Sequence, residues 1–245
     1  MKGIGVMVQP LPGWEYWITG LGQCPDEIVL DVRGRSCDAV LPDVPTDLTI
    51  LMHQKDWDKW SPSFVSSRHR PAVVVHNVSS WQAETIPCVT SVRVLQQISN
   101  LSAKPTGLIL LPEDVSGWTG SSSAFVLLQE ALRLFPETHI SFVSSSGFHV
   151  AAALLNQGVD SVLLGDQLLL LSDHPLPAAR KKRMARLQKS HVRTYHSRSD
   201  GSHIQVAPLD PDDWKPSDPA GLERYSLANA ADIACHCDER LRSDG

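Results

Sequence analysis

Short apolar runs recur along the first two thirds of the chain. Each run has four or five residues, is rich in Val, Ile and Leu, and is apolar on both faces. Such runs are typical of parallel strands buried on both sides, because half-exposed strands alternate apolar with polar residues. The pattern predicts eight strands, at Ile4–Val8, Ile28–Val32, Leu48–Met52, Ala72–His76, Cys88–Val92, Gly107–Leu111, Ile140–Ser144 and Ser161–Leu164.

The later segments between these runs have the periodicity of helices. The first is Ser121–Phe135, whose apolar side chains on one helical stripe are Phe125, Leu128, Leu132 and Phe135. A second helix is predicted over Phe148–Gln157, where Ala and Leu predominate, and Gly158 is suited to end it. The earlier segments, Leu11–Cys24 and Gly34–Asp47, contain Pro and Gly and predict only a turn or a short helix.

Eight buried strands that alternate with helices predict a (β/α)8 barrel of the TIM type. An open doubly wound sheet is the alternative if fewer strands form. We expect residues 1–175 to form the barrel and residues 176–245 to form a C-terminal extension. The extension is predicted to contain an exposed basic helix over Arg180–Arg198, a Pro- and Asp-rich linker over Pro208–Pro219, and a last helix over about Gly221–Arg242.

The composition is that of an ordinary folded protein. The chain of 245 residues is 42% hydrophobic and 20% charged, which excludes global disorder. Its formal charge of −5 argues against a basic nucleic-acid binder, and no apolar run approaches the ~18 residues that cross a bilayer. Five cysteines, an odd number, and an N-terminus without a signal-peptide core lead us to expect reduced thiols in the cytoplasm.

No metal site is expected. Cys235 and Cys237 flank a histidine and are the nearest approach to a ligand cluster. A structural zinc site needs four ligands, usually in two spaced pairs, and no second pair matches this one.

Two glycine-containing turns follow neighbouring strands of the predicted barrel. Ser146 and Gly147 precede the helix that begins at Phe148, and Gly165 and Asp166 follow the eighth strand. Ligands of such barrels bind at the carboxyl ends of the strands, and a phosphate commonly lies between the loops after strands seven and eight. The free N–H groups that begin the helix favour an anion there. The alternative is that both glycines only make tight turns.

The loop after the sixth strand, Pro112–Ser123, contains two carboxylates together with Gly117 and Trp118. We interpret it either as a loop that faces a substrate or a cofactor ring, or as a solvated turn capped by its serines.

Three histidines are candidates for acid–base chemistry. His53 and His76 lie at the ends of the third and fourth strands, so both are expected near the barrel mouth. His149 lies at the start of the helix after Gly147, where it would contact a phosphate or serve as a polar cap.

The stretches Gly107–Leu128 and Ser141–Leu171 resemble the nitronate monooxygenase (2-nitropropane dioxygenase) family of FMN-dependent barrels. They are similar in particular to the module at the front of some polyketide and glycolipid synthases. After strand six the family has a glutamate followed by Gly-Gly-His-x-Gly, and this chain has the segment from Glu113 to Gly120. The cofactor-binding residues that the resemblance implies are Ser146, Gly147, Phe148, Gly165, Asp166 and Gly117.

The chain departs from the family pattern at positions that matter for chemistry. The family's base is the histidine of the strand-six loop, whereas this chain has Trp118, whose indole has no basic nitrogen. Asp166 stands where the family has a small hydroxyl near the phosphate, and two unit charges ~4 Å apart repel by roughly 4 kcal/mol at an effective dielectric constant of ~20. Ser146 replaces the first glycine of a pair and adds a Cβ.

The resemblance implies two functions of different classes. The first is an FMN-dependent oxidoreductase, either a nitronate monooxygenase or an enoyl-reductase-like enzyme. Its substrate would be a small molecule or an acyl group on a carrier, and its partners would be synthase domains. The second is a catalytically degenerate scaffold that docks to such a synthase. A different phosphate-binding barrel is a third reading.

Overall fold

The chain forms a closed barrel of eight parallel strands. The computed structural model describes residues 3–8, 25–33, 47–65, 67–113, 117–144, 148–165, 178–184, 193–196 and 203–206. The barrel strands are β1 Gly3–Val8, β2 Ile28–Asp31, β3 Thr49–His53, β4 Arg70–Val74, β5 Ile86–Val89, β6 Gly107–Leu110, β8 His139–Ser144 and β9 Ser161–Leu164.

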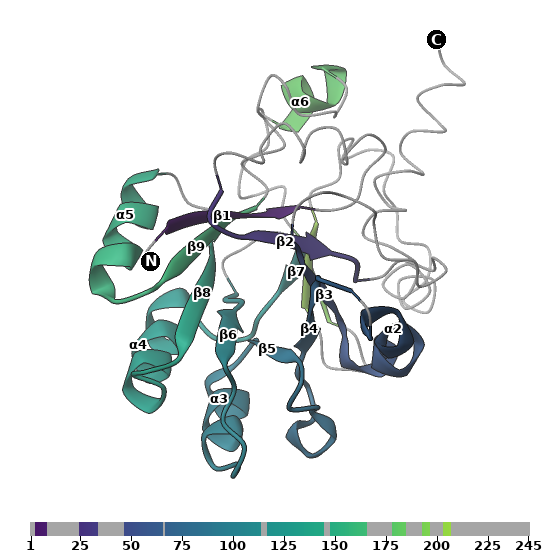
Figure 1. Cartoon of the computed structure of the whole chain (residues 1–245). Coiled ribbons are helices and arrows are strands. Elements are labelled where there is room, and N and C mark those ends of the chain that lie inside the picture. The colour runs from purple at the N-terminus through teal and green to yellow at the C-terminus, as the bar shows by residue number, and fades with distance from the viewer. Residues whose placement is uncertain are drawn as a thin grey trace.

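The strand order confirms the predicted barrel. The strands run β1-β2-β3-β4-β5-β6-β8-β9, and β9 pairs in parallel with β1 to close the ring. Figure 1 shows this ring with helices outside it. All eight predicted strands are present, and the open-sheet alternative is excluded.

Two apolar layers hold the barrel together. Inside the ring, alternate residues of the strands form one buried cluster, made of Val29, Leu51, Ala72, Val74, Cys88, Ile109, Leu111, Val143 and Leu163. Between the strands and the helices lies a second, larger cluster, to which both Trp57 and Trp60 of α2 belong. Because both faces of each strand are buried, the strands read as continuous apolar runs in the sequence.

Helices follow several of the strands. They are α2 Trp57–Phe64, α3 Val92–Ser99, α4 Ala124–Leu134 and α5 Phe148–Gln157, with short 3-10 turns at η1 Gln54–Asp56 and η2 Val78–Ser80. The prediction of α5 is confirmed at both ends, and Gly158 ends it with a φ of 118°, in the region that favours glycine. The early segments 11–24 and 34–46 lie outside the described residues.

The expected apolar stripe of α4 is wrong at one position. Phe125 is 67% exposed, whereas Leu127, Leu128 and Ala131 are the residues that pack inward. Ala124, in the same turn, packs against the core, and Phe125 follows it about 100° further around the helix, off the buried stripe.

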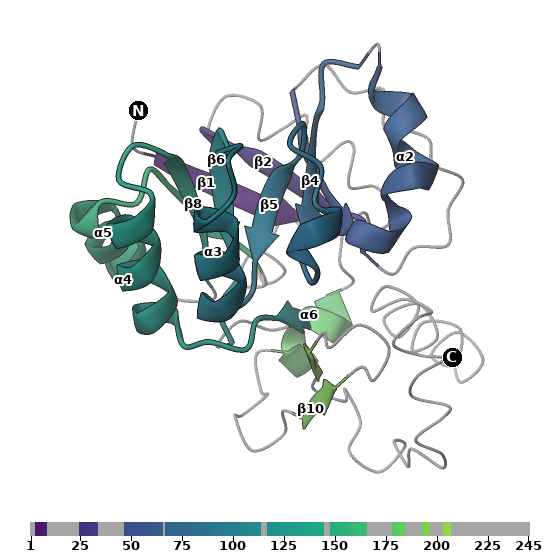
Figure 2. The ribbon, with the colours of Figure 1, turned by 90° about the horizontal axis from the view of Figure 1, so that it is seen from below.

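A second, small sheet lies at the carboxyl end of the barrel. Its strands are β7 Gly117–Thr119, β10 Arg193–His196 and β11 His203–Val206, in the order β10-β11-β7. In Figure 2 the arrowhead of β5 points toward α6 (Ala178–Met184) and β10, which places both beyond the carboxyl ends of the strands.

The C-terminal extension differs from its prediction where the structure describes it. We expected one basic helix over Arg180–Arg198, but α6 spans Ala178–Met184 and residues Arg193–His196 form a strand. Thr194 and Tyr195 have a high propensity for strands, and a prediction based on the density of basic residues overlooks it. The expected linker and last helix lie outside the described residues. Among the described helices, none is long and apolar enough to cross a bilayer.

Candidate functional site

A polar layer continues the barrel interior at the carboxyl ends of β2, β3 and β4. Val29, Leu51 and Val74 line the interior of the ring. Side chains of a strand alternate between its two faces, so a residue two positions further along points the same way. Asp31, His53 and His76 stand two positions after these interior residues and therefore face the barrel mouth.

Asp31 and Arg33 form a buried ion pair at the end of β2. Arg33 Nε and Nη2 donate to the two carboxylate oxygens of Asp31 at 2.8 and 2.7 Å, and the Arg33 backbone N–H donates to Oδ1 at 3.1 Å. Burial alone would lower the pKa of Arg33, but the charge and hydrogen bonds of Asp31 outweigh it and the pKa lies above its usual value. Arg33 therefore keeps its charge, which the Asp31 carboxylate compensates in a place with little solvent.

His53 and His76 stack on each other beside this pair. Their ring centroids are 6.3 Å apart and their planes meet at 27°. His53 ends β3 and is 3% exposed, while His76 is half-buried just beyond β4, where the Val75 N–H still bonds to the Cys88 carbonyl at 3.0 Å. His53 thus ends its strand as predicted, whereas His76 lies two residues beyond the end of β4.

Gln54 holds the two histidine-bearing loops together. Its side-chain oxygen accepts from the backbone N–H groups of His76 and Asn77 at 3.3 and 3.2 Å. Its side-chain nitrogen donates to the Asn77 carbonyl at 3.0 Å and to Ser80 Oγ at 3.1 Å. A single amide thus ties the start of η1 to the loop after β4 and fixes the spacing of His53 and His76.

Cys88 lies one layer deeper in the barrel and is no nucleophile. Burial raises the pKa of its thiol to about 12, and the nearby Arg33 only partly offsets this. A thiol with such a pKa stays protonated near neutral pH, and the thiolate is the reactive form.

The two glycine turns leave adjacent strands, as the sequence predicts. β8 and β9 are paired, with Ser144 in register with Leu164, so the chain leaves both strands at one level. A Cβ built on Gly165 would meet, among the described residues, only Met7 Cε at 3.9 Å, which leaves the backbone open on that side. Among the predicted phosphate-binding residues, positions 145–147 and 166 lie outside the described residues.

The helix after the first turn is described only in part. Phe148 is the first residue of α5, and its side chain is not among those described. His149 follows it and is exposed. Whether either residue contacts a ligand stays a prediction.

The strand-six loop is pinned at its base. The Glu113 N–H bonds to the Ser122 carbonyl at 3.0 Å, and the Gly120 N–H bonds to the Pro112 carbonyl at 2.9 Å. A Cβ on Gly120 would lie 2.0 Å from the Leu111 carbonyl oxygen, so only glycine fits at this crossing.

Part of the same loop is a strand. Gly117 and Trp118 lie in β7, opposite Gln205 and Ile204 of β11 in an antiparallel pair. The position at which the resembled family has its histidine is therefore part of a sheet built with the C-terminal extension.

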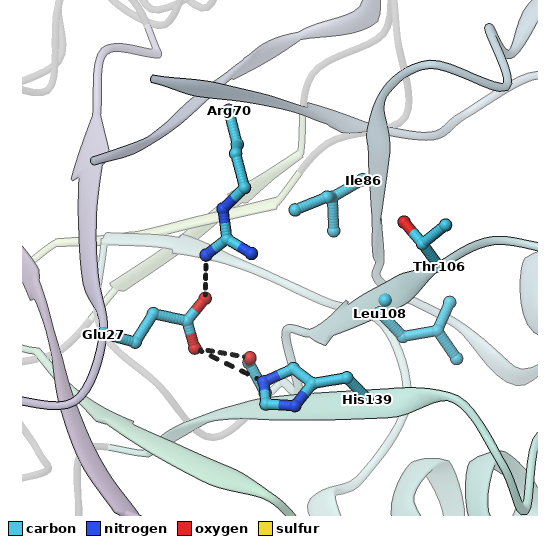
Figure 3. Close-up of a pocket in the computed structure, with 8 residues that line it drawn as sticks. Glu27, Arg70, Ile86, Thr106, Leu108 and His139 are labelled. Atoms are coloured by element: carbon cyan, nitrogen blue, oxygen red, sulfur yellow. Dashed lines mark hydrogen bonds and ion pairs between the residues drawn. The ribbon is translucent and has the colours of Figure 1, made fainter. Parts of the chain in front are cut away.

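A second polar cluster lies at the opposite end of the barrel, around a hollow of about 310 Å³ that opens to solvent. Figure 3 shows the carboxylate of Glu27 between Arg70 on one side and His139 on the other. Glu27 accepts from Ser141 Oγ at 2.6 Å and lies 3.7 Å from Arg70 Nη2 and 3.9 Å from His139 Nε2.

The charges of this cluster stabilise one another. Burial alone would raise the pKa of Glu27, but its interaction with His139 at 3.9 Å and the hydrogen bond from Ser141 outweigh burial, and the pKa is lowered. The pKa of His139 is raised, chiefly by its interaction with Glu27 and against partial burial. Glu27 stands between Ser141 and His139, so His139 is not placed to take a proton from the serine, as a nucleophilic triad requires.

Sequence reasoning missed both charged groups. Glu27, Arg70 and His139 lie at the amino ends of β2, β4 and β8, and the two-residue alternation through Val29, Ala72 and Val143 places all three on the inward face. The alternation along each strand could have revealed these inward-facing residues. It is hard to see in the sequence, because the outward-facing residues of a barrel strand are apolar as well. Asp31 and Arg33 were concealed in the same way.

The architecture is known from solved structures. The fold matches that of FabK from Thermotoga maritima. The alignment has a TM-score of 0.55 and 13% identity, and it covers 94% of this chain and 68% of the FabK chain. A mutant of the same FabK aligns with a TM-score of 0.51 and 13% identity over 79% of this chain and 60% of that chain.

Nitroalkane oxidase from Streptomyces ansochromogenes aligns with a TM-score of 0.47 and 12% identity over 78% of this chain and 64% of that chain. This chain therefore spans between 60% and 68% of the lengths of these structures. No family model and no curated protein matches the chain. The comparisons establish the fold, and the function rests on the site.

Proposed function

We propose that this chain is an FMN-binding oxidoreductase barrel. The observation that carries the proposal is the register of β8 with β9, whose last residues, Ser144 and Leu164, lie opposite each other at the carboxyl end of the barrel. A phosphate that lies between the turns after two such strands is bound by backbone N–H groups. The likeness to FabK in fold and the resemblance of the strand-six to strand-eight region support the same reading.

The residues fit a flavin phosphate in two respects. The Cβ side of Gly165 is open among the described residues, as close approach by a ligand requires. In addition, the charges of the buried pair Asp31 and Arg33 compensate each other, so this pair does not repel a dianion. Ser146, Gly147, Phe148, Gly165 and Asp166 would hold the phosphate end, and bound FMN would supply hydride chemistry.

We infer that the substrate is an acyl group, small or carrier-bound, and that the reaction is a reduction. Oxidation of a nitronate in the manner of the resembled family uses the histidine that this chain replaces with Trp118. Reduction of an enoyl group depends less on that base. A place beside the domains of a polyketide or fatty-acid synthase belongs to the same proposal.

The test is a titration of the purified protein with FMN, followed by flavin fluorescence and by the absorption spectrum. We expect saturable binding and a yellow protein. Gly165→Asp places a carboxylate beside the phosphate and should weaken binding at least tenfold, because repulsion at ~4 Å is worth up to roughly 4 kcal/mol. Gly165→Ala is the matched control, since its Cβ meets Met7 Cε at an ordinary 3.9 Å, and it should bind within about threefold of the parent.

A scaffold without catalysis is the second candidate. It is favoured by one observation, the incorporation of Gly117 and Trp118 into a sheet with the C-terminal extension, which removes the strand-six loop from free movement. A colourless protein that ignores added FMN would favour the scaffold and contradict the oxidoreductase.

A further inference from the structure

We propose that His53 and His76 form a substrate-binding imidazole pair that donates hydrogen bonds to an oxygen acceptor, the carbonyl of an acyl thioester. The inference deepens the proposed function and rests on it for the choice of an acyl substrate. It concerns residues that belong to none of the glycine turns.

The first argument is direction. Leu51 and Val74 line the barrel interior, so the alternation of β3 and β4 turns His53 and His76 inward at the carboxyl end. Ligands of this fold bind at that end, and side chains from several strand ends build the site. The layer of the barrel interior below the histidines is filled by apolar side chains, so packing alone does not call for histidine here.

The second argument is preorganisation. Four hydrogen bonds from the Gln54 amide hold the backbone next to His76 against the loop after His53. The stacked rings, 6.3 Å apart, are thereby fixed before any ligand arrives. A donor pair held in place by its surroundings binds an acceptor without a further loss of side-chain freedom.

The third argument is chemistry. A neutral imidazole has one N–H donor, which lies in the plane of its ring, so each ring of the stacked pair can present a donor to a carbonyl at its edge. A carbonyl oxygen is an acceptor only, which fits this arrangement. Asp31, on the adjacent strand, is paired with Arg33.

The test is NMR spectroscopy of the imidazole resonances of the full chain, assigned by His53→Gln and His76→Gln. The protein is titrated with FMN, with the crotonyl thioester of pantetheine, and with both. We expect the His53 and His76 resonances to shift with the thioester, and each glutamine variant to bind it about fivefold to tenfold more weakly.

Two other histidines serve as controls. His69 Nδ1 accepts from the Leu48 N–H at 3.2 Å, a structural role, and His139 lies at the other end of the barrel. Neither resonance should move. Thioester binding that leaves His53 and His76 unmoved, or thioester affinity unchanged in both glutamine variants, would overturn the inference. If FMN fails to bind, the proposed function fails. The titration with thioester alone still tests the histidine pair, because histidine resonances that do not shift would contradict the inference.

Discussion

Glu27 holds the amino end of the barrel together through contacts with several strands. It lies just before β2, and its carboxylate reaches Arg70 of β4 and both His139 and Ser141 of β8. A buried carboxylate is costly unless it is paired and hydrogen-bonded, and here both conditions are met. The floor of the barrel is therefore a network of charges that depends on protonation.

The network predicts a pH-dependent part of the stability. The folded-state pKa of His139 lies above its ordinary 6.5, so its contribution is complete below pH 6.5 and is lost as the pH rises through the raised value. The pKa of Glu27 lies below 4.5, so its contribution is present above that pH and is lost on acidification. The groups that face His139 are Glu27, Asp160 and Arg70, and the two carboxylates outweigh the cation.

We therefore expect His139→Gln to cost most between about pH 5 and 6.5 and progressively less toward pH 8. Because His139 is half exposed, the loss should be at most about 1 kcal/mol, or about 2–4 °C in Tm. Urea unfolding at several pH values measures it. Arg133→Gln, which breaks the ion pair with Glu130 on the surface of α4, is the control and should leave the pH dependence unchanged over this range. An equal cost of His139→Gln at every pH would contradict the account.

The elements divide into those set by local patterns and those set by distant partners. The barrel strands are buried on both faces, so each is visible as an apolar run before any pairing is known. β7 is different, because Gly117–Thr119 is short and becomes a strand only through β11, far along the chain. Strand propensity depends on the neighbours that a strand acquires, and those neighbours are not local in the sequence.

The pairing of β7 with β11 predicts that the C-terminal extension orders the strand-six loop. β11 is the middle strand of its sheet, and a proline removes a backbone donor and is poorly accommodated there. Ile204→Pro should increase hydrogen exchange of peptides that cover Gly117–Thr119 at least tenfold, which corresponds to the loss of about 1.4 kcal/mol of local stability. Ile204→Val is the matched control and should leave exchange within about twofold.

Exchange in this loop that is as slow in Ile204→Pro as in the parent would show that the base of the loop suffices to order it. That base is tied by the bonds of Gly120 and Glu113 to Pro112 and Ser122. The exchange of α4, which begins after the loop, reports whether the barrel itself is disturbed.

The whole molecule has two polar ends with different roles. The amino end carries the Glu27 cluster, which is satisfied by its own partners. The carboxyl end combines a histidine pair, a neutralised ion pair and two turns that leave adjacent strands. The (β/α)8 fold assigns stability to the first end and ligand chemistry to the second.

Much of this arrangement was predictable and part of it was not. The number of strands and their alternation with helices could be inferred from the apolar runs. The positions of His53, His76 and Gly165 near strand ends could be inferred from where those runs end. The stacking of the two imidazoles was not predictable, because Gln54 sets it through contacts between two loops. Phe125 was misplaced because the buried stripe of α4 begins at Ala124, a small residue that a stripe drawn through large apolar side chains overlooks.

The central claim is that the two turns after β8 and β9 bind the anionic end of a flavin. Comparing the affinities of the purified protein for FMN and riboflavin tests it most directly, because the two ligands differ only by the phosphate. Two charge-assisted hydrogen bonds worth about 1.5 kcal/mol each predict that FMN binds about 100-fold more tightly. Equal affinities for the two flavins, or no binding of either, would contradict the account.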